Sequence, residues 1–203
     1  MYKFGQIEIA SKKFNSQYQL IESVDLEKIR ISEGVVANKN DTRYKIGYEV
    51  EPGKIIPLYV KTPKDCVSPG VSRYNVSSPW KMGFNVSEDK EWVEQYKAIW
   101  AKIEELMGQK LTGEPLNNGK YINPKLITWE GEIKTSFRGK TREKFEEIGA
   151  CYATGILKIE SVYRQGSNYY FQVFLRGCKY TKRESSFEIK WSDDEDEGYD
   201  TVM

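Results

Sequence analysis

ILKIESVYRQGSNYYFQVFLRGCKY, residues 156–180, is the stretch that most strongly indicates the fold of this chain. Two runs rich in β-branched and aromatic residues, Ile156–Tyr163 and Tyr169–Tyr180, flank the five-residue connection RQGSN, which contains a glycine. Two such runs joined by a short glycine-containing segment are typical of a β-hairpin. The sequence therefore predicts a long antiparallel hairpin over about 156–180 as the last structured unit.

The residues before this hairpin contain one clear helical pattern. From Ser87 to Met107 the apolar residues recur three and four positions apart, which predicts an amphipathic helix over about 87–107 packed on a core. We expect Ser87 to cap its N-terminus and Gly108 to end it. Residues 24–86 are interrupted too often by proline and glycine for helices, and they are expected to form strands, as is Leu126–Phe137. A mostly β chain with one added helix favours an oligonucleotide-binding (OB) barrel.

The charges are unevenly distributed along the chain. The 203 residues include 31 Lys and Arg, 30 Asp and Glu and no histidine, for a net charge of +1. Residues 192–203, SDDEDEGYDTVM, hold six of the acids and no base, so residues 1–191 keep 31 basic and 24 acidic residues and a net charge of +7. We therefore expect a single basic domain over 1–191 and a disordered acidic tail over 192–203.

The composition also excludes several classes of function. Without histidine the chain cannot form a serine–histidine triad, an HExxH metalloprotease site or a histidine-ligated zinc site. Its three cysteines lack CxxC spacing, which favours reduced thiols. It has neither a stretch of roughly 20 apolar residues nor the apolar core of a secretory signal, so we expect a cytoplasmic or nuclear protein without a membrane partner. No cofactor or metal motif is present, which favours binding over catalysis.

The second hairpin run carries the clearest candidate binding surface. Side chains alternate along a strand, so the even-numbered residues from Tyr170 to Tyr180 should share one face, with Tyr169, Phe171, Val173 and Leu175 toward the core. Flat rings mixed with cations bind single-stranded nucleic acid, because bases stack on the rings and phosphates meet the charges. The alternative is a second packed face with a solvated basic end. The candidate residues are Tyr170, Phe174, Arg176, Lys179, Tyr180, Lys182 and Arg183.

Two further clusters combine cations with rings. One surrounds Gly139, whose missing side chain lets a backbone approach a phosphate; the other lies before the predicted helix. The alternatives are an ordinary solvated loop for the first and a buried tryptophan for the second. The candidates are Phe137, Arg138 and Lys140 in the first cluster, and Lys61, Lys64, Arg73, Tyr74 and Trp80 in the second.

The acidic tail and one E-x-K triplet suggest additional or competing functions. The tail can cover a basic groove and be displaced by DNA, and it can then recruit basic replication proteins; a simple solubilising role is the alternative. Glu132 and Lys134 match the end of a metal-dependent nuclease pattern, with Asp65 as a poorly placed upstream acid. A viral structural or scaffolding protein is a third possibility. RNA in place of DNA, and a homo-oligomer, also stay open.

Several segments together resemble a known family. PLYVKTPK (57–64), PGV (69–71) and WKMGF (80–84) precede the predicted helix, and GILKIESVYR (155–164) opens the hairpin. This order resembles the single-stranded-DNA-binding proteins of nucleocytoplasmic large DNA viruses, including that of African swine fever virus, over roughly residues 55–183. The resemblance implies an OB-like core that binds single-stranded DNA without sequence preference in viral replication, recombination or repair, in a virus factory. It places Lys61, Lys64, Arg176, Lys179 and Tyr180 near the DNA. Cys66 and Ser68 depart from the bulkier apolar residues expected there.

Overall fold

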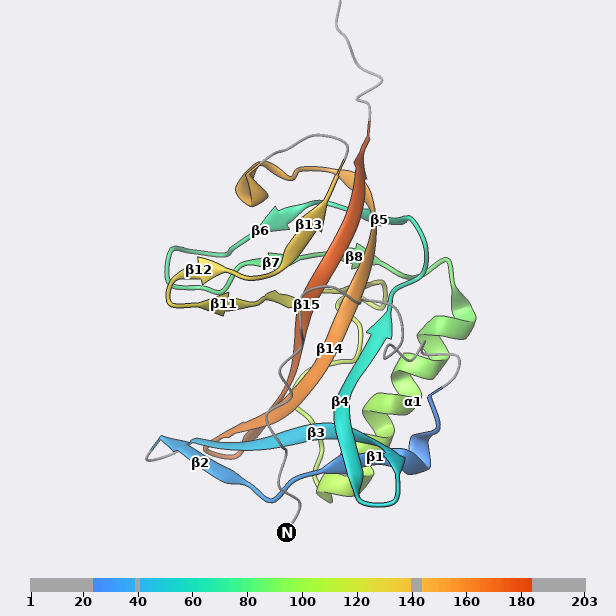
Figure 1. Ribbon diagram of the computed structural model, residues 1–203, viewed down its shortest axis with the longest axis vertical. Helices are drawn as coiled ribbons and strands as arrows, with labels where there is room; N and C mark the ends of the chain where they lie inside the picture. Colours follow the sequence, from blue (N-terminus) through green and yellow to red (C-terminus); the bar gives the residue numbers. More distant parts are fainter. Residues whose placement is uncertain (1–23, 39–40, 140–143, 184–203) are drawn as a thin grey trace, which may run out of the picture.

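The computed structural model describes residues 24–38, 41–139 and 144–183; Lys140 and the acidic tail lie outside them. Within these residues the fold class predicted from the sequence is confirmed, because the chain is mostly β with one α-helix (Figure 1). In chain order the elements are η2 (Leu26–Lys28), β1 (Ile29–Ile31), β2 (Val35–Asn38), β3 (Asp41–Glu51), β4 (Lys54–Lys61), β5 (Cys66–Ser68), β6 (Val71–Ser72), β7 (Lys81–Met82), β8 (Phe84–Asn85), α1 (Lys90–Met107), β9 (Tyr121–Ile122), β10 (Lys125–Leu126), β11 (Thr128–Trp129), β12 (Glu132–Ile133), β13 (Ser136–Arg138), η3 (Phe145–Glu147), β14 (Cys151–Gln165) and β15 (Asn168–Lys182).

The predicted hairpin is present as β14 and β15 and runs the length of the molecule (Figure 1). It is longer than predicted, because polar residues such as Gln165 and Asn168 continue the ladder and leave only Gly166 and Ser167 in the turn. Gly166 has a φ of 60°, a conformation open to glycine that two-residue hairpin turns require. The predicted five-residue turn is therefore wrong.

The hairpin is the centre of the main sheet, whose order is β1-β3-β4-β14-β15-β10-β7-β6. Strand β3 crosses one end of the hairpin: its first half pairs with β14 and its second half with β1 and β4. Three strands lie beside this path: β2 pairs with β3, β5 with the far end of β14, and β13 with that of β15. No pairing among the described strands joins β6 to β1, so a closed OB barrel stays a prediction.

The amphipathic helix is confirmed as α1, with a corrected start. Its N-cap is Asp89, whose carboxylate accepts a hydrogen bond from the backbone N–H of Trp92 at 2.9 Å, rather than Ser87. Gly108 ends it in the left-handed conformation. Trp92 and Trp100 are buried, as expected for core residues. No helix in the described part of the chain is long and apolar enough to span a membrane.

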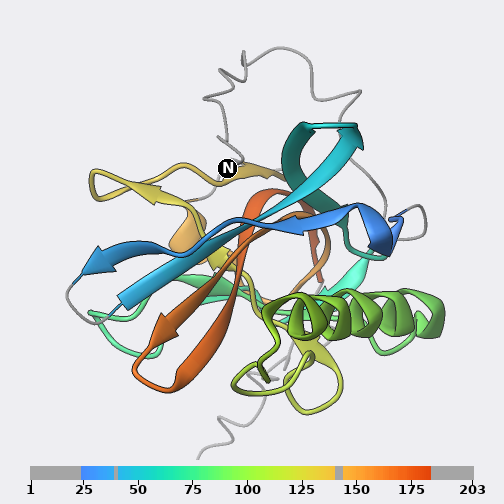
Figure 2. The same ribbon diagram turned by 90° about the horizontal axis from the view of Figure 1, so that it is seen from below.

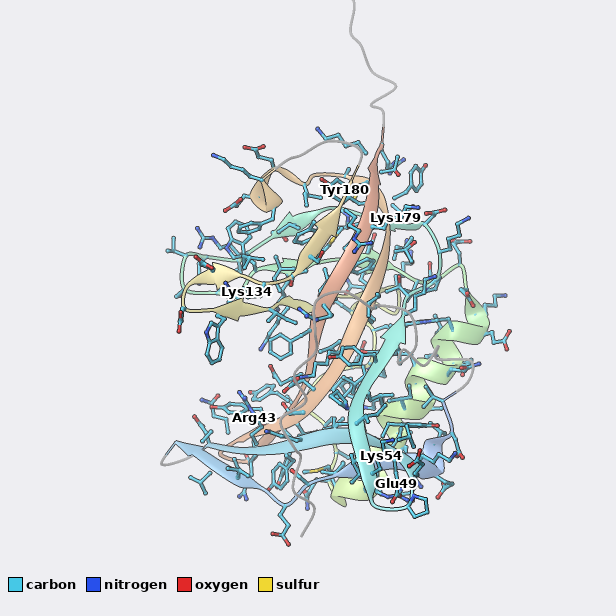
Figure 3. The ribbon with its side chains drawn as sticks, in the orientation of Figure 1. Arg43, Glu49, Lys54, Lys134, Lys179 and Tyr180 are labelled. Atoms are coloured by element: carbon cyan, nitrogen blue, oxygen red, sulfur yellow. The ribbon has the colours of Figure 1, made fainter. Side chains whose placement is uncertain are left out.

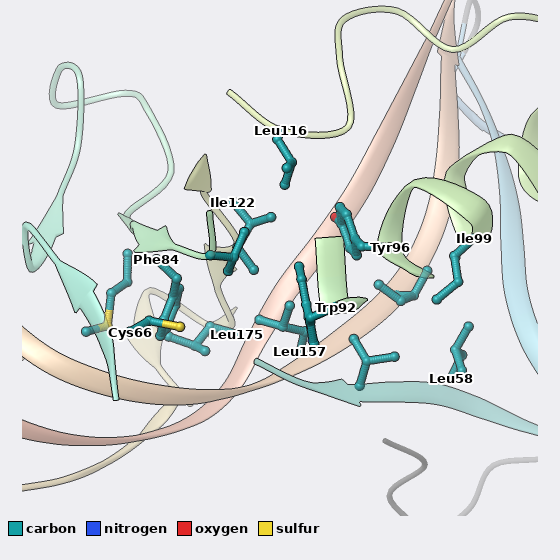
Figure 4. Close-up of a cluster of buried hydrophobic side chains, with 14 of the residues drawn as sticks. Leu58, Cys66, Phe84, Trp92, Tyr96, Ile99, Leu116, Ile122, Leu157 and Leu175 are labelled. Atoms are coloured by element: carbon teal, nitrogen blue, oxygen red, sulfur yellow. The ribbon is translucent and has the colours of Figure 1, made fainter. Parts of the chain in front are cut away.

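The hydrophobic core fills the space between α1 and one side of the hairpin (Figure 4). Leu157, Ile159 and Leu175 of the hairpin are fully buried there. Phe171 contacts the helix with its ring 5.2 Å from that of Trp100. The prediction that Tyr169, Phe171, Val173 and Leu175 face the core is confirmed. Among the described elements, α1 packs on this side of the hairpin and not on the other (Figure 2).

Two β-bulges change which side chains share a face. Glu160 of β14 has no partner in the hairpin register, because Ile159 pairs with Val173 and Ser161 with Gln172. Arg176 of β15 has none, because Leu157 pairs with Leu175 and Ile156 with Gly177. An extra residue reverses the alternation beyond it. Cys178 and Tyr180, only 4% exposed, therefore face the core. The prediction that they share a face with Tyr170 and Phe174 is wrong.

The three cysteines are buried and unpaired, which gives a direct solution test of the core. Burial raises the pKa of the Cys66 thiol to about 11, and it also raises the pKa values of Cys151 and Cys178. At about pH 8 we expect the thiols of the native protein to react with Ellman's reagent far more slowly than those of the unfolded protein. The unfolded protein should react at all three cysteines and release one thionitrobenzoate per thiol. The variant Ser72→Cys adds an exposed thiol as a positive control. Rapid modification of the native wild-type chain would contradict this packing.

Candidate nucleic-acid interface

The side of the β14–β15 sheet opposite α1, here called the outer face, gathers rings and cations from several strands. Residues paired across neighbouring strands point to the same side, so the pairing register defines this face. Figure 2 shows α1 on one side of the hairpin, whereas β4 and the β11–β12 hairpin lie on the other. The outer face comprises Tyr59 and Lys61 of β4, Thr154, Ile156 and Lys158 of β14, and Tyr170, Gln172, Phe174 and Lys179 of β15.

One row of side chains crosses five strands of this face. Tyr59 pairs with Lys158, Lys158 with Phe174, Phe174 with Lys125, and Lys125 with Lys81. Cations and rings thus alternate from Tyr59 to Lys125, and the row ends in a second cation, Lys81. Tyr59 is 8% exposed, and burial raises its pKa, so its ring lies in the buried floor of the outer face. Phe174, which is partly buried, is the ring in this row that a ligand can reach.

Four of the predicted cations line a single cavity of about 360 Å³ at one end of the outer face, here called the basic cavity. They are Lys61, Lys64, Arg138 and Lys179, all exposed. Among the described residues, one carboxylate lines the cavity, that of Asp65, which lies 3.9 Å from the Lys64 Nζ. Several like charges around one cavity repel one another, so a bound anion would stabilise them.

The strand register explains why these four cations converge. Lys61 lies opposite Ile156, and Lys179 lies between Thr154 of β14 and Arg138 of β13. The end of β4 is held in place by α1, because the Trp92 indole N–H donates a hydrogen bond to the carbonyl oxygen of Lys61 at 2.8 Å. The packing of α1 on the core thus determines where Lys61 leaves the sheet.

A short hairpin projects beside the outer face. Residues 127–135, here called the wing, leave the sheet after β10 and return at β13, with Glu130 and Gly131 in its turn at positive φ. At its base the Thr135 hydroxyl donates to the Leu175 carbonyl oxygen at 2.6 Å and accepts from the Ile127 N–H at 2.8 Å. Trp129 on the wing is 66% exposed. The prediction of one strand over Leu126–Phe137 is wrong, because this turn interrupts it.

Arg176, the bulge residue, lies between the two strands that flank the wing. Strand β10 pairs with β15 at Phe174 and Leu175, and β13 pairs from Gly177 onward. The Arg176 guanidinium donates to the carbonyl oxygen of Lys134 at 3.5 Å. Its charge also lowers the pKa of Tyr59, opposing the effect of burial. Arg176 therefore connects the wing to the floor of the outer face. Figure 3 shows the cations that frame this face, with Lys179 toward one end, Arg43 toward the other and Lys134 on the side of the wing.

Several predicted residues lie elsewhere. Tyr180 is buried, and the Gly139 backbone packs on its ring so closely that a Cβ there would lie 2.4 Å from Tyr180 Cζ. Phe137 is partly buried against the core. Lys182 ends β15 beyond the basic cavity, and Arg183 follows it, with its guanidinium 5.7 Å from the Tyr152 ring.

The cluster around Trp80 is also separate from the basic cavity. Trp80 packs against the core and meets Phe145 edge to face, with ring centroids 5.3 Å apart. The Arg73 guanidinium covers its other side at 4.4 Å. Tyr74 is 95% exposed beside them. These three candidates surround β6 and β7, at the end of the sheet.

This region also contains four residues that the sequence patterns did not predict: Lys158, Lys125, Arg43 and Trp129. Alternation along the first hairpin strand, applied as it was to the second, would have found Lys158 opposite Phe174. Lys125 and Arg43 reach this region through strand pairings that are distant in sequence, and no local pattern identifies them. Trp129 lies within the segment predicted as one continuous strand, so its exposed position on the wing was not expected.

The residues of the nuclease alternative do not assemble a metal site within the described chain. The Glu132 carboxylate forms an ion pair with the Lys134 ammonium on the wing, and both side chains are largely exposed. Asp65 lies in the basic cavity, among cations. The described residues contain no group of three or more Cys, Asp or Glu side chains that could hold a metal ion.

Comparisons with known proteins add no assignment to this geometry. The resemblance to viral single-stranded-DNA-binding proteins therefore stays a prediction from short motifs. No family model matches the chain, and no curated protein sequence matches it.

Proposed function

We propose that the outer face binds single-stranded DNA without sequence preference, in support of DNA replication, recombination or repair. The observation that carries this proposal is the basic cavity, where three strands and a turn contribute Lys61, Lys64, Arg138 and Lys179 next to the row of side chains that contains Phe174. Cations that meet phosphates, beside rings on which bases stack, are the two components of single-strand binding surfaces.

The binding mechanism follows from the arrangement of charge and rings. The basic cavity neutralises phosphates and releases their counterions, which makes the affinity fall steeply with salt. Phe174 and Tyr170 lie along β15 from the cavity, so bases of one bound strand can stack on them. Both rings are partly buried in the sheet, which favours the splayed bases of a single strand over the paired bases of a duplex.

The acidic tail belongs to the same proposal. With six acids and no base, residues 192–203 compete with DNA for the cations of the outer face. DNA displaces the tail and makes it accessible to basic replication proteins. Removal of 192–203 should therefore increase the affinity for DNA at low salt.

The first test is fluorescence anisotropy of labelled oligo-dT, titrated at two salt concentrations with duplex DNA as competitor. Salt-sensitive binding that duplex does not compete away supports the proposal. An absence of binding at low salt contradicts it and favours the scaffolding alternative, which self-assembly measured by light scattering would then reveal. Loss of DNA only when Mg²⁺ is present, abolished by Glu132→Ala, would instead establish the nuclease.

Phe174→Ala should weaken oligo-dT binding about 5- to 150-fold, because one base–ring stack contributes about 1–3 kcal/mol. Phe174→Tyr is the matched control, since it keeps the ring and should bind within about twofold of wild type. Anisotropy titrations at constant salt measure both. Unchanged affinity in Phe174→Ala would show that bases do not stack at the centre of the outer face.

A further inference from the structure

A second cavity opens at the free edge of β15. It has a volume of about 500 Å³ and lies between residues 170–173 of β15 and the segment that links α1 to β10. Strand β10 pairs with β15 only at Phe174 and Leu175. Nearer the hairpin turn, the backbone N–H of Thr112 donates a hydrogen bond to the carbonyl oxygen of Tyr169. Residues 170–173 between these pairings border the cavity, here called the edge pocket.

The back of the edge pocket is aromatic. It is formed by Tyr96 and Trp100 of α1 with Phe171, whose ring centroid lies 6.4 Å from that of Tyr96 and 5.2 Å from that of Trp100. Tyr121 and Tyr170 form part of its rim. A cavity of this size with flat walls accommodates a nucleobase, which is itself flat and largely apolar on its faces.

Hydrogen-bonding groups surround this aromatic back. The side chains of Asn117, Asn123 and Gln165 contribute amides, each of which is both donor and acceptor. The backbone N–H and C=O of Tyr169 form hydrogen bonds with Thr112, on the side of β15 away from β14. The direction of these backbone groups alternates along a strand. The N–H and C=O of Phe171 therefore point to the same side as those of Tyr169, into the pocket. Amides of this kind read the edge of a base, and adenine is their common partner.

The mouth of the edge pocket is cationic and joins the outer face. The Lys125 ammonium donates to the Gln172 side-chain oxygen, and Lys81 lies on the adjacent strand. Burial, together with the charges of Lys81 and Arg43, lowers the pKa of Lys125. An anion at this position relieves the repulsion among the three cations. A phosphate is the anion that accompanies a base in the pocket.

We propose that the edge pocket takes one nucleotide of the bound strand, with its base against Trp100 and Phe171 and its phosphate at Lys125 and Lys81. This inference rests on the proposed function and adds to it a position at which one base, adenine by the chemistry of the amides, is preferred. Tyr170, Gln172 and Lys125 belong to both the pocket and the outer face, so a strand on that face can place a nucleotide here without leaving it.

Isothermal titration of the full chain with AMP, UMP and inorganic phosphate tests this inference. We expect AMP to bind at least about tenfold more tightly than inorganic phosphate, with UMP between them. Equal affinities for AMP and phosphate would show a simple anion site and overturn the proposal, as would an absence of AMP binding. Anisotropy with oligo-dT, run in parallel, reports on the outer face independently. Oligo-dT binding without AMP binding refutes only the pocket, whereas AMP binding without oligo-dT binding refutes the proposed function.

Two variants assign the AMP site to the pocket. Lys125→Gln should weaken AMP binding at least about fivefold, and Lys97→Gln on the exposed side of α1 is the control with the same change in charge. The exposed pair Asn117→Ala/Gln165→Ala should preserve folding and remove the preference for AMP over UMP. AMP binding that is insensitive to both variants would place the nucleotide elsewhere and contradict the proposal.

Discussion

The double variant Lys61→Gln/Lys179→Gln is expected to bind oligo-dT roughly fifty-fold more weakly than wild type at about 50 mM salt, since each lost phosphate contact on a single strand changes the salt exponent by about 0.7. Both ammonium groups line the basic cavity, and both are exposed, so their loss should leave the fold intact. The slope of log K against log salt should fall in magnitude by about 1.4. Anisotropy titrations over a series of salt concentrations give both numbers.

A matched control separates the cavity from net charge. Lys97→Gln/Lys110→Gln removes the same two charges from α1 and the residues after it; Lys97 pairs with Glu94 and Lys110 with Glu104. This control should change affinity by less than about threefold and leave the salt slope unchanged. An equal loss of affinity in both double variants would mean that the affinity for DNA depends on the overall charge of the protein. The basic cavity would then have no special role.

The predictions from sequence succeeded where a pattern was local. The period of α1 and the alternation from Tyr169 to Leu175 each come from a few consecutive residues, and both are confirmed. The alternation fails at Arg176, where one extra residue enters the ladder. Gly177 immediately follows Arg176, and an isolated glycine in a strand is a signal for such a bulge. The sequence therefore does contain a local signal for the bulge.

The candidate site was harder to predict because it depends on distant pairings. Lys61, Lys64, Arg138 and Lys179 were all named from basic clusters, but their position around one cavity depends on β4 pairing with β14 and β13 with β15. Lys125 carries no local signal at all, since it enters the outer face through a two-residue strand. Single-sequence patterns identify the types of residue in such a site and cannot place them together.

The buried side of the bulge leads to the prediction with the largest expected effect on stability. Tyr180→Ala should lower the free energy of unfolding by about 3–5 kcal/mol, as the removal of a large buried ring does. For a chain of this size that corresponds to a loss of roughly 6–20 °C in the melting temperature, measured by circular dichroism. The physical reason is that Tyr180 is 4% exposed and the Gly139 backbone packs directly on its ring.

Tyr180→Ala and Phe174→Ala together decide which face of β15 meets the ligand. If the bulge at Arg176 reverses the alternation, Tyr180→Ala loses stability and still binds oligo-dT normally at temperatures where it is folded. Phe174→Ala then shows the opposite pattern, with weaker binding and a smaller loss of stability, because its ring is only partly buried. Without the bulge the two rings would share one face, and both variants would weaken binding. A stable Tyr180→Ala protein with impaired binding would therefore restore the uninterrupted strand and move the DNA site to the end of the hairpin.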